Sequence, residues 1–266
     1  MLIIGELINA SRKAVGEALE KRDADAIRKL AKDQVEAGAD YIDVNAGGFV
    51  GREAELLKWL VTTVQDCVGN PCCIDSSDPR AIEAAMAVHK GPAMVNSISL
   101  EKGRFDEVLP LLAGADVKVV ALCMSDDGMP VTCAERVSVA EKLIDGLVRN
   151  NVSLDGIHVD PLVQPVSTND RYGVEFLKAV REIMSRFEGV HTICGLSNIS
   201  YGLPERKFLN RNFAVMAVAG GLDSLIVNPL DRRMMTSLLA AEALAGKDPY
   251  CMKFIRAYRA GKLEST

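Results

Sequence analysis

Residues 157–162 read Ile157-His158-Val159-Asp160-Pro161-Leu162, a short apolar run that ends in an aspartate. An apolar run closed by Asp or Asn occurs at five more places, where the closing residues are Asp43, Asp75, Asn96, Asn198 and Asn228. Runs of this length and composition are typical of buried parallel strands. Segments with helical periodicity separate most of them, which predicts alternating strands and helices.

Eight such strands can be numbered along the chain. They cover residues 2–5, 41–44, 72–74, 93–95, 117–122, 157–159, 192–196 and 224–227. Helical patterns follow the first six strands at 25–37, 56–64, 79–88, 105–112, 137–147 and 174–187. After the seventh strand a long loop runs to residue 211 and a helical pattern continues to 219, and the last helical pattern covers 232–245. A chain of 266 residues suits an α/β fold of the (β/α)8 TIM barrel type, for which about 250 residues is typical. With no linker visible, we expect residues 1–266 to form one domain.

The alternative fold is a doubly wound open sheet. Eight parallel strands, and the lack of a Gly-rich dinucleotide turn after the first strand, make it the weaker interpretation.

The composition excludes several classes of protein. A net charge of −5 argues against nucleic-acid binding, which favours a basic face. No apolar stretch approaches the roughly 20 residues that span a bilayer, and the chain starts in a strand without a basic leader, so we expect neither a membrane protein nor a signal peptide. The seven cysteines form no CxxC pair and are interpreted as buried thiols, which favours a cytoplasmic location. Their spacing does not suit a metal site.

A barrel brings the C-terminal ends of all its strands to one mouth, so the six closing residues should ring one pocket. They supply acceptors and amides but almost no positive charge and no nucleophile, which predicts a ligand rich in N–H donors. A pterin fits, because its amide N–H beside an exocyclic amine forms a donor pair that a carboxylate accepts at two points. Asp75 and Asp160 are the natural acceptors, and Asn96 can both donate and accept. An alternative stays open: any one of these residues can simply cap a helix or turn, and Asp43 can be an internal barrel residue.

The chain also resembles a known family. It is similar to the methyltetrahydrofolate:corrinoid protein methyltransferases and to the folate domain of cobalamin-dependent methionine synthase. The segments that carry the resemblance are 1–9 (MLIIGELIN), 43–45 (DVN), 74–76 (IDS), 94–97 (MVNS), 160–162 (DPL), 195–200 (GLSNIS), 210–213 (NRNF) and 221–223 (GLD).

The resemblance implies a dihydropteroate-synthase-like barrel that moves a methyl group between N5 of tetrahydrofolate and the cobalt of a corrinoid. It also implies a homodimer. In the family, the residues matching Asp75, Asn96 and Asp160 hold the pterin, and the residue matching Asn198 hydrogen-bonds near N5. Glu6, in the first motif, and Asp43 join the residues predicted to bind the substrate.

Asn198 is the predicted catalytic residue, because its amide can rotate to donate to or accept from N5 in either charge state. The proton source stays open between solvent and Asp160. Arg206 and Lys207, in the predicted loop after the seventh strand, are the cations predicted to meet the anionic folate tail or the corrinoid protein.

The corrinoid is expected on a separate partner protein. No histidine has Asp two residues before it and Gly three residues after it, the motif that would supply a lower ligand to cobalamin. From overall similarity we expect the reaction to form methyltetrahydrofolate from a methylated corrinoid protein.

Two departures from the family pattern stand out: Leu7 replaces an arginine, which puts a local salt bridge in doubt, and Tyr201 replaces a glutamine found in some relatives. The competing functions are a non-catalytic folate-binding protein, a dihydropteroate synthase and a metal-dependent aldolase. The chain lacks the Asn-x-Thr-Pro-Asp-Ser-Phe and Ser-x-Arg-x-His motifs of the synthase and any carboxylate–histidine cluster for the aldolase.

Overall fold

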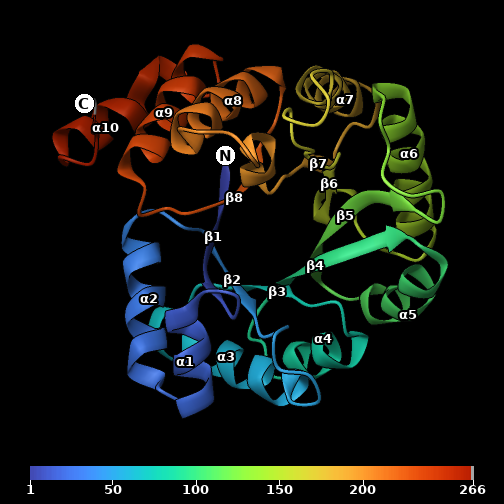
Figure 1. Cartoon of the computed structure of the whole chain (residues 1–266), viewed down its shortest axis with the longest axis vertical. Helices are drawn as coiled ribbons and strands as arrows, with labels where there is room; N and C mark the ends of the chain where they lie inside the picture. The colour runs from blue at the N-terminus through green and yellow to red at the C-terminus, as the bar shows by residue number, and fades with distance from the viewer. Residues whose placement is uncertain (265–266) are drawn as a thin grey trace.

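The computed structural model describes residues 1–264, and eight parallel strands form a barrel surrounded by helices (Figure 1). The strands are β1 (Leu2–Asn9), β2 (Tyr41–Asn45), β3 (Cys72–Asp75), β4 (Ala93–Leu100), β5 (Val117–Ser125), β6 (Ile157–Asp160), β7 (His191–Thr192) and β8 (Ser224–Val227). Each strand pairs with its neighbour in sequence, and β1 pairs with β8. Between β7 and β8 the barrel is closed by the N–H of Ile226, which donates to the carbonyl of Cys194 at 3.0 Å. The predicted barrel is confirmed, and the open sheet is wrong.

The helices form the outer ring of the barrel. They are α1 (Lys13–Lys21), α2 (Ala24–Glu36), α3 (Glu53–Val68), α4 (Pro79–Met86), α5 (Lys102–Leu112), α6 (Cys133–Arg149), α7 (Tyr172–Arg186), α8 (Arg206–Gly220), α9 (Arg232–Leu244) and α10 (Met252–Arg259). Three short 3-10 helices complete the structure: η1 (Leu154–Gly156), η2 (Leu196–Ser200) and η3 (Pro249–Cys251).

The apolar residues form an inner and an outer layer, because strand side chains alternate between the barrel interior and the helices. The buried residues of the inner layer are Ile4, Tyr41, Cys73, Met94, Val120 and Ile193. The outer layer packs the other face of the strands against helix residues such as Leu57 and Leu60 of α3. Polar residues therefore enter the barrel only near its two ends.

The region after the sixth strand differs most from the sequence-based expectation. Strand β7 has only two residues instead of the predicted 192–196, because the chain leaves the sheet and buries Leu196 and Ile199 from the turn η2. Helix α8 begins at Arg206 rather than near 211, directly after Glu205, whose φ of 50° ends the preceding loop. Arg206 and Lys207 are therefore helical and do not lie in a loop.

Two helices were not predicted. Helix α1 contains Gly16, which weakens a helical pattern, yet it buries Val15, Ala18 and Leu19 on one face. Helix α10 is strongly amphipathic but buries only Ala257, so its apolar signal is weak.

The cysteines follow the prediction in part. Cys72, Cys73, Cys123 and Cys194 are buried free thiols, whereas Cys251 is exposed because it lies in the η3 turn at the surface. Within residues 1–264, none of the helices combines the length and the apolar character needed to cross a membrane.

Candidate active site

Four polar residues lie side by side in the sheet, three of them at the ends of β1, β2 and β3 and the fourth inside β4. The parallel register places Asn9 beside Asn45, Asn45 beside Asp75, and Asp75 beside Asn96. Residues in register on neighbouring strands project to the same face of the sheet, and this row lies at the C-terminal ends of β1 to β3, which form the mouth of the barrel. Nδ2 of Asn45 donates to Oδ2 of Asp75 at 2.9 Å, which fixes the orientation of that carboxylate.

Asp43 lies one layer deeper in the barrel than this row. Its side chain is buried, and within the described chain its Oδ1 has no hydrogen-bond partner. Burial, together with the charges of Asp75 and Glu6, raises the pKa of Asp43 well above its usual value, although Cys73 and Asn96 partly offset the rise. Asp43 therefore retains its proton to a higher pH than an exposed aspartate.

Glu6 lies on β1, on the same side as Asp43. Burial raises its pKa, and the opposing charge is Arg12, whose Nη2 is 3.4 Å from Oε1 of Glu6. Leu7, which replaces an arginine of the family pattern, is buried and carries no charge, and Glu6 forms its ion pair with Arg12 instead.

Asp75 keeps more of its acidity than burial alone would allow. Burial raises its pKa, but the hydrogen bond from Asn45 and the charge of Arg104 oppose the rise. The guanidinium of Arg104 donates to the carbonyls of Ser76, Ser77 and Ser97 and therefore joins the loop that follows β3 to strand β4. Arg104 thus adds positive charge beside Asp75 without forming a salt bridge to it.

Asp160 ends β6 and is buried. Its Oδ1 accepts the backbone N–H of Leu162 at 2.8 Å. Burial raises the pKa of Asp160 to about 7, even though the N–H groups of Leu162 and Gly195 and the charge of Arg136 stabilise its ionised form. Near neutral pH this carboxyl group can therefore be either ionised or protonated.

Arg136 holds the loop after β6 as Arg104 holds the loop after β3. Its side chain is fully buried in α6, and Nε donates to the carbonyl of Pro161 at 2.8 Å. Nη1 and Nη2 donate to the carbonyls of Val131 and Leu162 at 2.6 Å and 3.4 Å. Three of its four acceptors are main-chain oxygens and the fourth is Oε1 of Gln164 at 3.5 Å, so Arg136 fixes the backbone around Asp160 without forming a salt bridge to the carboxylate.

Asn198 lies in η2 and is exposed at the end of β7. Its side-chain amide forms no hydrogen bond with another part of residues 1–264, so it can meet a ligand. Arg206 holds the turn beside it: Nη2 donates to the carbonyl of Ser197 at 2.7 Å, and Nε to Oγ of Ser200 at 3.1 Å. The guanidinium also lies 5.9 Å from the ring centroid of Tyr201.

The helix-cap alternative applies to some of the six strand-end residues and not to others. Helix α4 is capped by Asp78 and not by Asp75, and helix α9 is capped by Asp231. Asn228 does form a local turn, because its Oδ1 accepts the N–H of Leu230 at 2.9 Å. Asp43, Asp75, Asn96 and Glu6 are brought together, while Asp160 and Asn198 come from the β6 and β7 side of the mouth.

A second polar cluster lies at the opposite end of the barrel, which we call the base. Nδ1 of His191 is 2.6 Å from Oδ2 of Asp223, and His158 stacks on His191 with ring centroids 4.8 Å apart. His89, the third histidine of the chain, accepts the N–H of Cys72 at the start of β3. All three histidines therefore lie away from the mouth. In the described chain no group of three His, Cys, Asp or Glu residues could hold a metal ion.

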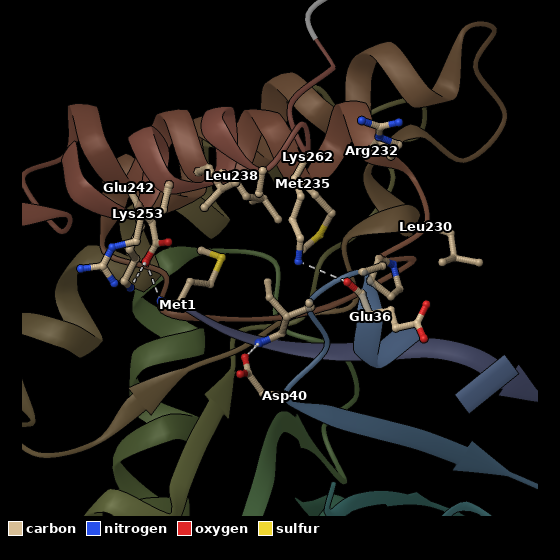
Figure 2. A pocket seen from close by; sticks show the side chains of 18 of the residues that line it. Met1, Glu36, Asp40, Leu230, Arg232, Met235, Leu238, Glu242, Lys253 and Lys262 are labelled. Carbon is tan, nitrogen blue, oxygen red and sulfur yellow. Dashed lines mark hydrogen bonds and ion pairs between the residues drawn. The ribbon is translucent and has the colours of Figure 1, made fainter. Parts of the chain in front are cut away.

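A groove of about 860 Å³ lies on the flank of the barrel between α2, α9 and α10 (Figure 2). Leu238 and Met235 line it, and Glu242 pairs there with the N-terminal amine of Met1 at 2.5 Å. The predicted site residues are not among the described residues that line it, so its size does not make it the predicted active site.

Sequence reasoning did not identify Asn45, Arg104 and Arg136. Asn45 follows Asp43 by two residues, so strand alternation alone places it on the same face. Arg136 lies on the apolar face of its helix, next to Val137 and one turn before Ala140, and a charged residue at such a position signals a buried role. No feature of the sequence near Arg104 indicates its contacts with Ser76 and Ser97.

Comparison with known proteins gives a consistent result. A sequence profile described as "pterin binding enzyme" matches residues 5–228. A methylcorrinoid:tetrahydrofolate methyltransferase from Eubacterium limosum is 38% identical over 265 residues, which are 99% of this chain and 98% of that protein. A methionine synthase from Mycobacterium tuberculosis is 33% identical over 242 residues, which are 86% of this chain but 20% of that protein.

Solved structures support the fold. A dihydropteroate synthase from Coxiella burnetii, in complex with pteroic acid, matches with a TM-score of 0.70 and 18% identity over 93% of this chain and 94% of that chain. A 7,8-dihydropteroate synthase from Vibrio fischeri matches with a TM-score of 0.71 and 17% identity over the same shares. At this level of identity the likeness concerns the fold alone.

Proposed function

The chain belongs to the pterin-binding enzyme family, and from this premise we propose that it is a methyltransferase acting between a methylated corrinoid and tetrahydrofolate. The observation that carries the proposal is a mouth rich in buried acceptors, combined with similarity over 99% of the chain to a methylcorrinoid:tetrahydrofolate methyltransferase. That relative's name also supports the direction, in which tetrahydrofolate receives the methyl group.

The pterin ring would lie in the mouth between the two sides of the barrel. Asp75 and Asp160 would accept its N–H donors, and Asn96 would pair with a ring position that both donates and accepts. Loss of one such buried partner typically costs about 1–3 kcal/mol, which makes the site selective for a ring with matching donors. Arg104 and Arg136 would hold the backbone that aims these acceptors.

Asp43 and Glu6 would support the site from below. Because the pKa of Asp43 is raised well above its usual value by burial, this group can carry a proton and donate to its neighbour Asn96 or to the ligand. A protonated Asp43 would also limit the repulsion between carboxylates when Asp75 is ionised. The same reasoning applies more weakly to Glu6, whose pKa is also raised by burial.

The chemical step would take place at N5 of tetrahydrofolate. The N5 lone pair attacks the methyl carbon, the cobalt–carbon bond breaks with its electron pair left on cobalt, and N5 then loses its proton. The amide of Asn198 is exposed at the mouth and can accept from N5–H before the transfer and donate to the N5 lone pair after it. An interaction that strengthens as the charge on N5 changes accelerates the step, whereas uniform binding does not.

The corrinoid would be brought by a partner protein. All three histidines lie at the base of the barrel or beside the start of β3, so none can ligate cobalt at the mouth. The homodimer, the cytoplasmic location and the organisation of residues 1–266 as one domain remain predictions. The assigned roles of Asp43, Asp75, Asn96, Asp160, Asn198, Arg206 and Glu6 are part of this proposal.

Methyl transfer can be tested directly with the purified chain, tetrahydrofolate and methylcobalamin or a methylated corrinoid protein. We expect the absorption spectrum to change from methyl-cobalt to Co(I) as methyltetrahydrofolate forms. Binding of tetrahydrofolate without any spectral change would favour the non-catalytic folate-binding protein. Formation of dihydropteroate from a pterin pyrophosphate and p-aminobenzoate would favour the synthase.

A further inference from the structure

A small pocket of about 290 Å³ lies between the first turns of α8 and α9. We call it the basic pocket, and it is lined by Lys207, Arg211, Leu230, Asp231, Arg232, Arg233 and Glu264. Its cationic side chains outnumber its acidic ones, although the whole chain has a net charge of −5. A local excess of positive charge on an acidic protein indicates a site for an anion.

The basic pocket lies at the N-terminal ends of α8 and α9, which are on the mouth side of the barrel because each helix follows the C-terminal end of a strand. Lys207 follows Arg206, which holds the turn that carries Asn198. Leu230 lies just beyond Asn228 at the end of β8 and donates its N–H to that residue. The two walls of the basic pocket thus begin in the segments that follow β7 and β8. Leu230 also lines the flank groove, at whose edge it is seen in Figure 2.

One wall of the basic pocket already holds a carboxylate of the chain itself. Nε of Arg233 donates to Oε1 of Glu264 at 3.0 Å, and Nε of Arg232 is 3.9 Å from Oε2. On the other wall, Lys207 and Arg211 have no acidic partner among residues 1–264, and Nε of Arg211 donates to the carbonyl of Lys207 at 3.2 Å. The first wall therefore binds a glutamate side chain, and the two cations of the other wall are available for a further carboxylate.

We propose that the basic pocket binds the carboxylates of the glutamate tail of the folate substrate, with Lys207 and Arg211 as their partners. The inference rests on the proposed function and extends it to the part of the substrate that leaves the mouth. With the pterin in the mouth, the p-aminobenzoyl group and its γ-linked glutamates must cross the rim. Each added glutamate brings one more carboxylate, so a longer tail gains more from the cations.

The test compares tetrahydropteroyl monoglutamate with tetrahydropteroyl triglutamate by calorimetry on the full chain. We expect the triglutamate to bind about fivefold more tightly, a gain that corresponds to exposed ion pairs and weakens with added salt. In the double variant Lys207→Gln/Arg211→Gln the two ligands should bind equally, because the tail carboxylates lose their cationic partners.

A matched control removes two exposed cations from other helices. Lys58→Gln/Lys142→Gln, on α3 and α6, lowers the charge by the same amount and should keep the preference for the triglutamate. Thermal unfolding of both variants checks that the fold is intact.

Three outcomes would overturn the inference. Equal binding of the two ligands by the unaltered protein would remove the tail site but leave the proposed function in place. A preference that survives in Lys207→Gln/Arg211→Gln would do the same, and if that variant loses only methyl transfer from the corrinoid protein, the basic pocket binds the partner instead. Failure to bind either ligand would overturn the tail site and the proposed function together.

Discussion

The mouth and the base of the barrel both place carboxyl groups among buried strands, yet the pKa of these groups shifts in opposite directions at the two ends. At the base, hydrogen bonds from His191 and Thr192 hold the pKa of Asp223 below its usual value although burial opposes them, and the pKa of His191 is raised in turn. At the mouth, burial raises the pKa of Asp160 to about 7 and also raises the pKa of Asp75.

The difference lies in how the nearby cations are used. His191 contacts carboxylates directly, at 2.6 Å to Asp223 and 3.2 Å to Asp155. Arg104 and Arg136 donate to main-chain carbonyls and to the side chain of Gln164 instead, and leave Asp75 and Asp160 without an ion pair. A cluster whose charges are paired stabilises the fold, whereas carboxylates that lack an ion-pair partner within the protein can accept hydrogen bonds from a ligand.

Asn198→Ala should separate catalysis from binding most clearly. Removing a directed amide at the reacting atom is expected to lower the rate of methyl transfer by about 100-fold, with a smaller loss of tetrahydrofolate affinity. Single-turnover transfer from methylcobalamin and calorimetry measure the two quantities. Equal losses in both would mean that Asn198 only anchors the ring.

Asp160→Ala should weaken binding of tetrahydrofolate by at least about tenfold, because the ring donors lose a charged acceptor. Calorimetry at constant pH measures the change. Binding within about twofold of the unaltered protein would remove Asp160 from the site.

The affinity for tetrahydrofolate should depend on pH through Asp160. The ionised carboxylate is the acceptor form, and the pKa of the free group is about 7, so the affinity should fall as the pH drops below 7. Between pH 8 and pH 6 the loss should approach about tenfold if only the ionised form binds. Asp160→Asn should bind more weakly and show a flat profile, whereas an unchanged slope in that variant would assign the titration to another group.

Asp223→Asn should affect stability and leave the mouth unchanged. We expect a loss of about 1 kcal/mol in the free energy of unfolding, with tetrahydrofolate affinity within about twofold of the unaltered protein. Urea unfolding and calorimetry provide both values. A large loss of affinity at unchanged stability would show that Asp223 contributes to ligand binding rather than to the stability of the barrel.

The effect of Asp223→Asn should also depend on pH with a defined sign. The raised pKa of His191 means that its contribution is complete below its ordinary value of 6.5 and is lost as the pH rises through the raised value. The lowered pKa of Asp223 means that its contribution is present above 3.8 and is lost at lower pH. The stability difference between the two proteins should therefore be larger at pH 5.5 than at pH 9, to be measured by urea unfolding.

Local patterns in the sequence explain why the barrel was predictable. Each strand–helix unit carries its own periodicity, and a polar residue directly after an apolar run marks the strand end that faces the mouth. The two-residue β7 and the start of α8 at Arg206 were not predictable in this way. The apolar residues Leu196 and Ile199 belong to the core, but they reach it from a turn rather than from a strand.

The sequence by itself determined the alternation of eight strands with the helices that follow them and the polar residues at the strand ends, because both depend on neighbours within a few positions along the chain. Only the tertiary structure decided which carboxylates lack an ion-pair partner within the protein and can bind a ligand. Arg104 reaches the carbonyl of Ser76, 28 residues earlier, and Asp223 meets His191, 32 residues before it. Burial and pairing across such separations set the pKa of each carboxyl group, and so distinguish the end that can bind a ligand from the end that holds the barrel together.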